Sequence, residues 1–197
     1  LDGSGGPSHE IGALFLGAGV DAESDGQIDP LLTAFGDDND GNDDEDGVVL
    51  NGFLIPTTNA DFEVVVGGTV SGMAVVAAWH DWDHSGTFEA NEFYTMTVSA
   101  VGNYSMLAPV PSNYDNSVTL ASRFRVFDAG VFPGGSLDAA DYGGSVVNGE
   151  IEDYVWTPPT AVSVSKQNTS IDLAIGLTIA ITMLLSVTTA LLQQKQR

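Results

Sequence analysis

The residues whose types and spacing suggest the most definite chemistry lie between Asp81 and Glu92. Counted from Asp81, oxygen-bearing side chains stand at positions 1, 3, 5, 9 and 12, and Gly86 stands at position 6. This is the pattern of a twelve-residue calcium loop, in which position 7 binds through its carbonyl and position 12 through both carboxylate oxygens. The predicted calcium ligands are Asp81, Asp83, Ser85, the carbonyl of Thr87, Glu89 and Glu92.

The surroundings of this loop differ from those of helical calcium loops. A candidate strand ends at His80 and another begins near Phe93, so the loop would connect two strands. The apolar residue at position 8, Phe88, is expected to anchor the loop on the core. A polar hairpin connection without metal is the alternative.

A second acidic region lies nearer the N-terminus. Residues 21–46 contain eleven Asp and Glu residues and no Lys or Arg. Carboxylates so close together repel one another, and a divalent cation relieves the repulsion. We therefore predict further calcium ligands here, with a solvated acidic loop as the alternative. The candidate ligands are Asp21, Glu23 and Asp25 in a first stretch and Asp38, Asp40, Asn42 and Asp44 in a second.

The overall charge narrows the classes of partner. The 197 residues include 27 Asp and Glu but only 5 Lys and Arg, which gives a formal net charge of −22. Nucleic-acid binding is excluded, because phosphates require basic neighbours. No cysteine is present, so an exported domain would depend on packing or bound metal for its rigidity.

The elements that must position these loops are strands. Short apolar or alternating runs separated by Gly, Pro and Asn predict an antiparallel β-sandwich over residues 1–157. Within it, side chains of Met73, Val75, Ala77 and Trp79 would share one face. Similarly, Ser122, Phe124 and Val126 would lie opposite Arg123, Arg125 and Phe127. The predicted strands cover residues 62–66, 73–80, 93–101, 117–127 and 151–156.

The C-terminal part has the pattern of a membrane anchor. Residues 173–192 carry no charge, and as a helix they would span about 30 Å, the thickness of the hydrocarbon core. We predict a transmembrane α-helix over 171–192, a linker over 158–170 and a tail over 193–197. Lys195 and Arg197 favour a cytoplasmic tail and a periplasmic or extracellular N-terminal domain. The start at Leu1 is compatible with a removed signal peptide or with a longer parent protein.

Six short motifs, taken in order, resemble the GEVED domain of bacterial extracellular and surface-anchored proteins. They are LGAGVDAE at 16–23, DGQ at 25–27, NDDEDGV at 42–48, AW at 78–79 before the Asp81 loop, RFR at 123–125 and GEIEDY at 149–154. The similarity extends over roughly residues 8–156. It implies a β-sandwich interaction module with acidic, calcium-binding loops and no enzymatic activity of its own. The motif that gives the family its name has Ile151 where Val is usual.

The last motif supplies further candidates. We expect Glu150, Glu152 and Asp153 to complete a metal site with one of the two acidic stretches before residue 47. Tyr154 and Trp156 are expected to pack in the core.

Three functions compete on these grounds. The favoured one is a non-catalytic, calcium-stabilised, single-pass membrane protein that serves as a structural or accessory subunit beside other membrane-protein subunits. The alternative is a tethered surface module for adhesion or ligand binding. A hydrolase using Asp81, Glu89 and Glu92 with His80 or His84 is disfavoured, because calcium would occupy the same carboxylates and general acid catalysis needs a free one. No small-molecule substrate is indicated.

Overall fold

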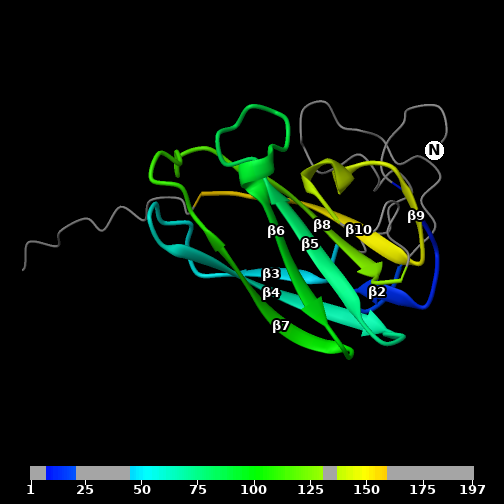
Figure 1. The fold of residues 1–197 in the computed structure, drawn as a ribbon. Helices are drawn as coiled ribbons and strands as arrows, with labels where there is room; N and C mark the ends of the chain where they lie inside the picture. Colours follow the sequence, from blue (N-terminus) through cyan, green and yellow to red (C-terminus); the bar gives the residue numbers. More distant parts are fainter. Residues whose placement is uncertain (1–7, 21–44, 131–136, 159–197) are drawn as a thin grey trace, which may run out of the picture. The chain divides into compact units, whose positions relative to one another are not determined.

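The structure, a computed structural model, describes residues 8–20, 45–130 and 137–158 (Figure 1). Within these ranges the chain forms β-strands and two short 3-10 helices, so the prediction of an antiparallel all-β domain is confirmed. The strands are β1 (Ser8–Glu10), β2 (Leu14–Leu16), β3 (Val48–Asn51), β4 (Asn59–Gly68), β5 (Ala74–His80), β6 (Phe93–Val98), β7 (Gly102–Pro109), β8 (Leu120–Asp128), β9 (Ser145–Val147) and β10 (Gly149–Trp156). The 3-10 helices are η2 (Ala90–Glu92) and η3 (Ala139–Tyr142).

The first sheet has the strand order β10-β8-β5-β6, and all of its pairs are antiparallel. His80 at the end of β5 lies opposite Ser122 of β8. Trp79 lies opposite Phe93, so the connection from Asp81 to Glu92 leaves the sheet between the adjacent strands β5 and β6.

The second sheet is built around β4. Strand β7 pairs with residues 59–66 of β4, whereas β3 pairs with residues 61–64 and β2 with residues 66–68. Because these paired segments overlap, β7 occupies one edge of β4, and β3 and β2 follow one another along the other edge. A small parallel pair, β1 with β9, completes the pairing among the described residues.

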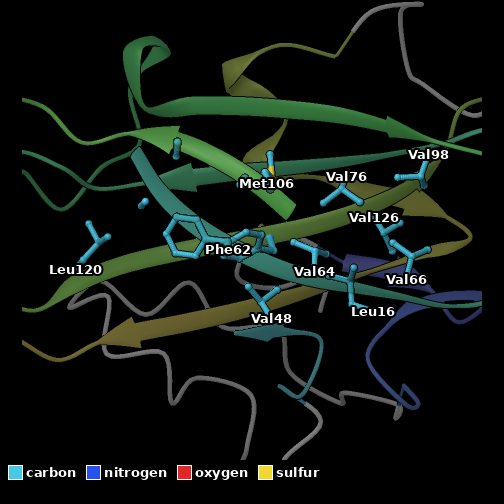
Figure 2. Packing of buried hydrophobic residues seen from close by; sticks show 14 of the residues in the cluster. Leu16, Val48, Phe62, Val64, Val66, Val76, Val98, Met106, Leu120 and Val126 are labelled. Carbon is cyan, nitrogen blue, oxygen red and sulfur yellow. The ribbon is translucent and has the colours of Figure 1, made fainter. Parts of the chain in front are cut away.

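The inner faces of the two sheets share one hydrophobic core. Alternate residues of β4 point inward, and Phe62 packs against Phe124 of the opposite sheet at 5.5 Å between ring centroids. Tyr154 and Trp156 pack against this core from β10, as predicted. Figure 2 shows side chains of this core, and the ten that it labels come from both sheets: Leu16, Val48, Phe62, Val64, Val66, Val76, Val98, Met106, Leu120 and Val126.

A second, smaller cluster covers the outer face of β5 and β8. It contains Ala77, Trp79 and Phe127, with Phe88 and Leu137 packed against it. The alternation predicted for residues 73–80 and 117–127 is therefore correct in period, but both faces of β5 are buried, since the segments that contain η2 and η3 cover its outer side.

The predicted strands correspond to β4, β5, β6, β8 and β10, with ends shifted by up to three residues. Strand β4 continues two residues beyond its predicted end, through Gly67 and Gly68. Strand β7 was not predicted: its first residues, Gly102 and Asn103, are of types that are common in turns. No helix among the described ranges is long and apolar enough to cross a membrane. The predicted anchor at 171–192, the tail and all but Pro158 of the linker lie outside those ranges.

Candidate metal centre

The connection between β5 and β6 gathers three carboxylates. One oxygen from each of Asp81, Asp83 and Glu92 lies within 4.8 Å of the others. Asp81 and Glu92 are buried, whereas Asp83 is exposed. These residues hold positions 1, 3 and 12 of the predicted loop, so the structure brings together its first ligands and its last.

The backbone wraps around the first carboxylate. Ser85 N donates to Asp81 Oδ1 at 2.9 Å and to Asp83 Oδ1 at 3.0 Å, and Gly86 N donates to Asp81 Oδ2 at 3.1 Å. Gly86 has φ +81° with no atom near the position of a Cβ. Glycine is thus favoured there by the left-handed backbone and not by lack of space.

The last carboxylate is fixed from inside the loop. Glu92 Oε1 accepts from Trp82 N at 2.7 Å, and Glu92 Oε2 accepts from Glu89 N at 3.1 Å. The second bond belongs to a capping box at the start of η2. Glu92 Oε1 also accepts from Asp83 N at 3.4 Å. A carboxylate oxygen has two lone pairs, so Glu92 Oε2 retains capacity for a cation.

The middle positions converge through one hydroxyl. Ser85 Oγ lies 3.2 Å from the Thr87 carbonyl oxygen and 3.1 Å from Glu89 Oε1. Thr87 Oγ1 donates to the same Glu89 oxygen at 2.6 Å. The other oxygen, Glu89 Oε2, is shielded from solvent and accepts no hydrogen bond from the described residues. A shielded carboxylate oxygen without a donor is a suitable ligand for a cation.

The protonation of these groups reflects their crowding. Burial, and after it the neighbouring Glu89 carboxyl, raises the pKa of Glu92 to about 7. Burial likewise raises the pKa of Asp81. Hydrogen bonds, first that from Thr87, hold the pKa of Glu89 below its ordinary value. A bound cation would favour the charged form of all three carboxylates.

The donor set fits a hard cation. All six predicted ligands offer oxygen and none offers nitrogen or sulfur, which suits calcium or magnesium more than zinc. The irregular mixture of carboxylates, hydroxyl and carbonyl suits calcium better than the strict octahedron of magnesium.

The loop is anchored on both sides. Phe88 anchors the loop, as predicted from its position 8, but on the smaller outer cluster and not on the main core. On the other side, Trp82 and His84 contact the ring of Tyr114 at 5.3 and 5.6 Å between centroids. His80 points away from the loop: it is fully buried, stacks on Phe62 at 4.5 Å, and its Nδ1 lies 2.8 Å from Ser122 Oγ. A hydrolytic site in this loop would therefore have to work without His80.

Of the second acidic region, residues 21–46, the structure describes only Glu45 and Asp46, together with the residues that flank the region. Asp21, Glu23, Asp25, Asp38, Asp40, Asn42 and Asp44 lie outside the described residues. The segments that flank this region meet on β4: Gly17 N donates to Val65 O at 2.9 Å, and Val65 N donates to Gly47 O at 2.7 Å. Asp46 Oδ1 joins them by accepting from Ala18 N at 2.9 Å. A Cβ on Gly47 would come within 2.7 Å of Gly17 N, so the close approach requires glycine.

Alternate residues of β10 and the residue before it bind the backbone of this edge. Glu150 accepts from Leu16 N. Glu152 accepts from Gly47 N at 3.0 Å and from the Tyr154 hydroxyl at 3.0 Å, and that hydroxyl accepts from Val48 N at 2.9 Å. We call Asn148, Glu150, Glu152 and Tyr154 the acceptor row, since Asn148 Oδ1 also accepts from Ala13 N at 3.0 Å.

As members of the acceptor row, Glu150 and Glu152 have a role that the sequence did not indicate. Asp153 points the other way and forms an ion pair with Arg123, with Arg123 Nε 2.7 Å from Asp153 Oδ1. That Glu150, Glu152 and Asp153 also bind metal with the segment 21–44 stays a prediction. The period-two spacing from Asn148 to Tyr154 was the available signal, but the partners are backbone groups more than a hundred residues away.

The arginines of β8 stabilise the outer side. Arg125 is fully buried, and its Nη1 donates to the carbonyl oxygens of Asp141 at 2.6 Å and Gly143 at 2.7 Å. Its guanidinium also lies over the Phe127 ring at 4.8 Å. Arg125 therefore holds the segment containing η3 against the sheet.

Comparison with known proteins bears on the region containing the loop. Residues 75–157 match the GEVED domain family. The matched region contains the loop Asp81–Glu92, called the metal loop below after its proposed ligand, both β8 arginines and the acceptor row. The resemblance over residues 8–74 rests on the motifs alone. No curated protein and no solved structure matches the chain.

Proposed function

We propose that this chain is a non-catalytic β-module whose loop Asp81–Glu92 binds calcium and is stabilised by it. The observation that carries the proposal is the convergence of the Asp81, Asp83 and Glu92 carboxylates within 4.8 Å. The shielded oxygen of Glu89, which accepts no hydrogen bond from the described residues, supports it further. When bound, calcium would join the end of β5 to the start of β6 and relieve the repulsion between the carboxylates.

Thermal unfolding tests the metal. Calcium at about 100 times its dissociation constant should add about 2.7 kcal/mol to the free energy of unfolding. Asp81→Asn should abolish that gain while keeping a hydrogen-bond acceptor for the loop. Asp61→Asn makes the same change of charge on the outer face of β4 and should keep the gain.

Terbium provides a direct measure of binding at the same loop. Trp82 lies inside the loop and is buried, so excitation of tryptophan should sensitise luminescence from a bound terbium ion. Calcium should displace the ion, and Trp82→Phe should weaken the signal. Calcium that leaves both the melting curve and the terbium signal of the unmodified chain unchanged would contradict the proposal.

We further propose that the module is tethered to the membrane as a structural or accessory subunit. The support is the uncharged run at 173–192, followed by Lys195 and Arg197. This arrangement favours a single membrane span with the tail in the cytoplasm and the β-module on the periplasmic or extracellular side. Association with a partner helix would use the small residues Gly176 and Ala180, four positions apart.

Purification in mild detergent separates this proposal from the alternative, a tethered adhesion module. A subunit should co-purify with fixed partners in constant proportion, and Gly176→Leu should reduce that association without reducing insertion. An adhesin should come out alone with either residue.

A further inference from the structure

Apart from the loop Asp81–Glu92, the segments that meet at one end of the β-module carry almost no charge. Residues 48–60 and 154–158 contain no charged side chain, and residues 104–122 contain one, Asp115, in a chain of net charge −22. The strand register brings these segments together: Asn59 lies opposite Pro109, and Trp156 lies opposite Leu120. Figure 1 shows the loop that joins β3 to β4 beside the end of β10.

A groove of about 580 Å³ opens at this end. Its lining includes Leu50, Phe53, Leu54, Ile55, Tyr114 and Pro158. Phe53 is 64% exposed and Ile55 is 51% exposed, so two large apolar side chains project from the loop that lines the groove. Exposed apolar groups gathered around an apolar groove indicate an interaction surface.

The loop that carries these side chains is held in place. Thr57 N donates to Val110 O at 3.0 Å, and Val110 N donates to Thr58 O at 2.8 Å. A third bond, from Thr58 N to Ile55 O at 3.1 Å, closes the turn. Because the backbone is fixed, Phe53 and Ile55 can be buried by a partner without the entropic cost of ordering a loop.

The path of the chain indicates the partner. Pro158 lines the groove, and twelve residues separate it from the predicted membrane span that begins at residue 171. A flexible chain of that length has a root-mean-square span of about 20 Å. The groove would therefore be the part of the module nearest the bilayer, at a high effective concentration of lipid.

We propose that this end, led by Phe53 and Ile55, docks on the lipid interface of the membrane that tethers the chain. The inference rests on the proposed tether. Because none of the residues that line the groove is charged, the groove would bind at the boundary of headgroups and acyl chains through apolar contact, on neutral as well as anionic lipid. Tyr114 is suited to that depth, with an apolar ring and a polar hydroxyl.

The test uses the full chain in phosphatidylcholine vesicles that contain a nitroxide-labelled headgroup lipid, with calcium present. Since the chain has no cysteine, single-cysteine variants can carry one fluorophore each. Ile55→Cys and Val101→Cys are a matched pair, with native side chains 51% and 50% exposed. They lie at opposite ends, because Val101 follows the end of β6 that pairs with the start of β5. Docking predicts that the Ile55 label is quenched several-fold more than the Val101 label.

Alkaline carbonate extraction keeps the two proposals distinguishable. A chain that resists extraction but shows equal quenching at both labels overturns docking and leaves the tether standing. Release of the chain by carbonate shows that the proposed tether is wrong. In that case stronger quenching of the Ile55 label before extraction would still support docking. Equal quenching of the two labels would overturn docking. A label at Ile55 that is shielded from water but not quenched by lipid indicates a protein partner or a second copy, and overturns the lipid assignment.

A pair of double variants tests the side chains themselves. With a label at Asn116→Cys on the rim of the groove, Phe53→Ser with Ile55→Ser should reduce quenching several-fold. Met73→Ser with Val101→Ser removes equally exposed apolar groups from the other end and should leave quenching unchanged. Equal quenching in both double variants would overturn the proposal, provided that their melting curves match.

Discussion

At the scale of single residues, His80 is a polar group placed in an apolar core. Its ring lies among Phe62, Trp82, Tyr94 and Phe124. Burial lowers the pKa of His80 to about 3, so the folded domain keeps it neutral over most of the acid range. An unfolded chain would protonate it near the ordinary pKa of about 6.5.

This difference predicts a dependence of stability on pH. Between about 6.5 and 3 the unfolded state binds one proton more than the folded state, so the stabilisation is present above pH 6.5 and is lost as the pH falls. The loss from this residue should be about 1.4 kcal/mol per pH unit. His80→Phe keeps an aromatic ring and should make the slope of the unfolding free energy against pH less positive by that amount between pH 6.5 and 5, as measured by denaturant unfolding in EDTA. Glu92, whose pKa is raised to about 7, contributes a slope of opposite sign that is the same in both proteins. An unchanged slope would show that His80 is not the group responsible.

Glu152 is the central member of the acceptor row. Glu152→Ala leaves the amide of Gly47 without its acceptor and should cost about 2–3 kcal/mol. If Glu152 acts through the Gly47 amide and the Tyr154 hydroxyl, the loss should be the same with calcium and with EDTA. If the loss occurs only with calcium present, Glu152 is a metal ligand and not mainly an acceptor for the backbone.

These residues show which parts could be predicted from sequence. The metal loop could be, because its ligands are close together in the chain and their spacing alone fixes the pattern. The acceptor row could not be, because Glu150 and Glu152 bind backbone amides, which leave no signature in the residue types at positions 16 and 47. Their place beside an acidic segment led to the prediction of metal, which stays a prediction; the structure adds that Glu150 and Glu152 bind amides at the edge of the opposite sheet.

At the scale of elements, the metal loop depends on one left-handed glycine. Gly86 and Gly52 both have positive φ, +81° and +94°, and at neither residue would an added Cβ meet another atom. Alanine at either site should cost about 1–2 kcal/mol from backbone strain alone. In EDTA the two variants should lose similar stability, whereas only Gly86→Ala should reduce the gain produced by calcium. Equal calcium gains in both would mean that the turn at Gly86 does not shape the site.

Among the strands, the long ones could be predicted from the sequence and the short ones could not. Strands β4, β5 and β8 are seven to ten residues long, which is enough for a strand to be recognised, and the alternation in burial is clearest in β4. Strands β2 and β3 are three and four residues long, too short for a period to be recognised. Their place is fixed by β4 on one side and by the acceptor row on the other, which only the folded structure reveals. The acceptor row also occupies amides at an edge where unpaired ones would invite association with another chain.

At the scale of the whole molecule, the proposed topology places the acidic module and the basic tail on opposite sides of a membrane. An impermeant maleimide applied to intact cells should therefore label a cysteine introduced at Val101 and should not label one introduced at Gln196. Opening the membrane with detergent should expose both. Labelling of the tail alone in intact cells would reverse the orientation.

The meeting of Gly17 and Gly47 on Val65 has a consequence for how such domains can vary. Strands β2 and β3 lie along β4 as two parts of an interrupted strand, and everything between residues 17 and 47 begins and ends at one point of the sheet. A segment inserted in this way can change in length at little entropic cost, about 0.6 kcal/mol for each doubling of its length. Replacing residues 19–45 with a short Gly-Ser bridge should leave the core able to fold. The same position should accept a foreign peptide, which makes it a natural graft site for displaying a new binding sequence on an otherwise unchanged scaffold.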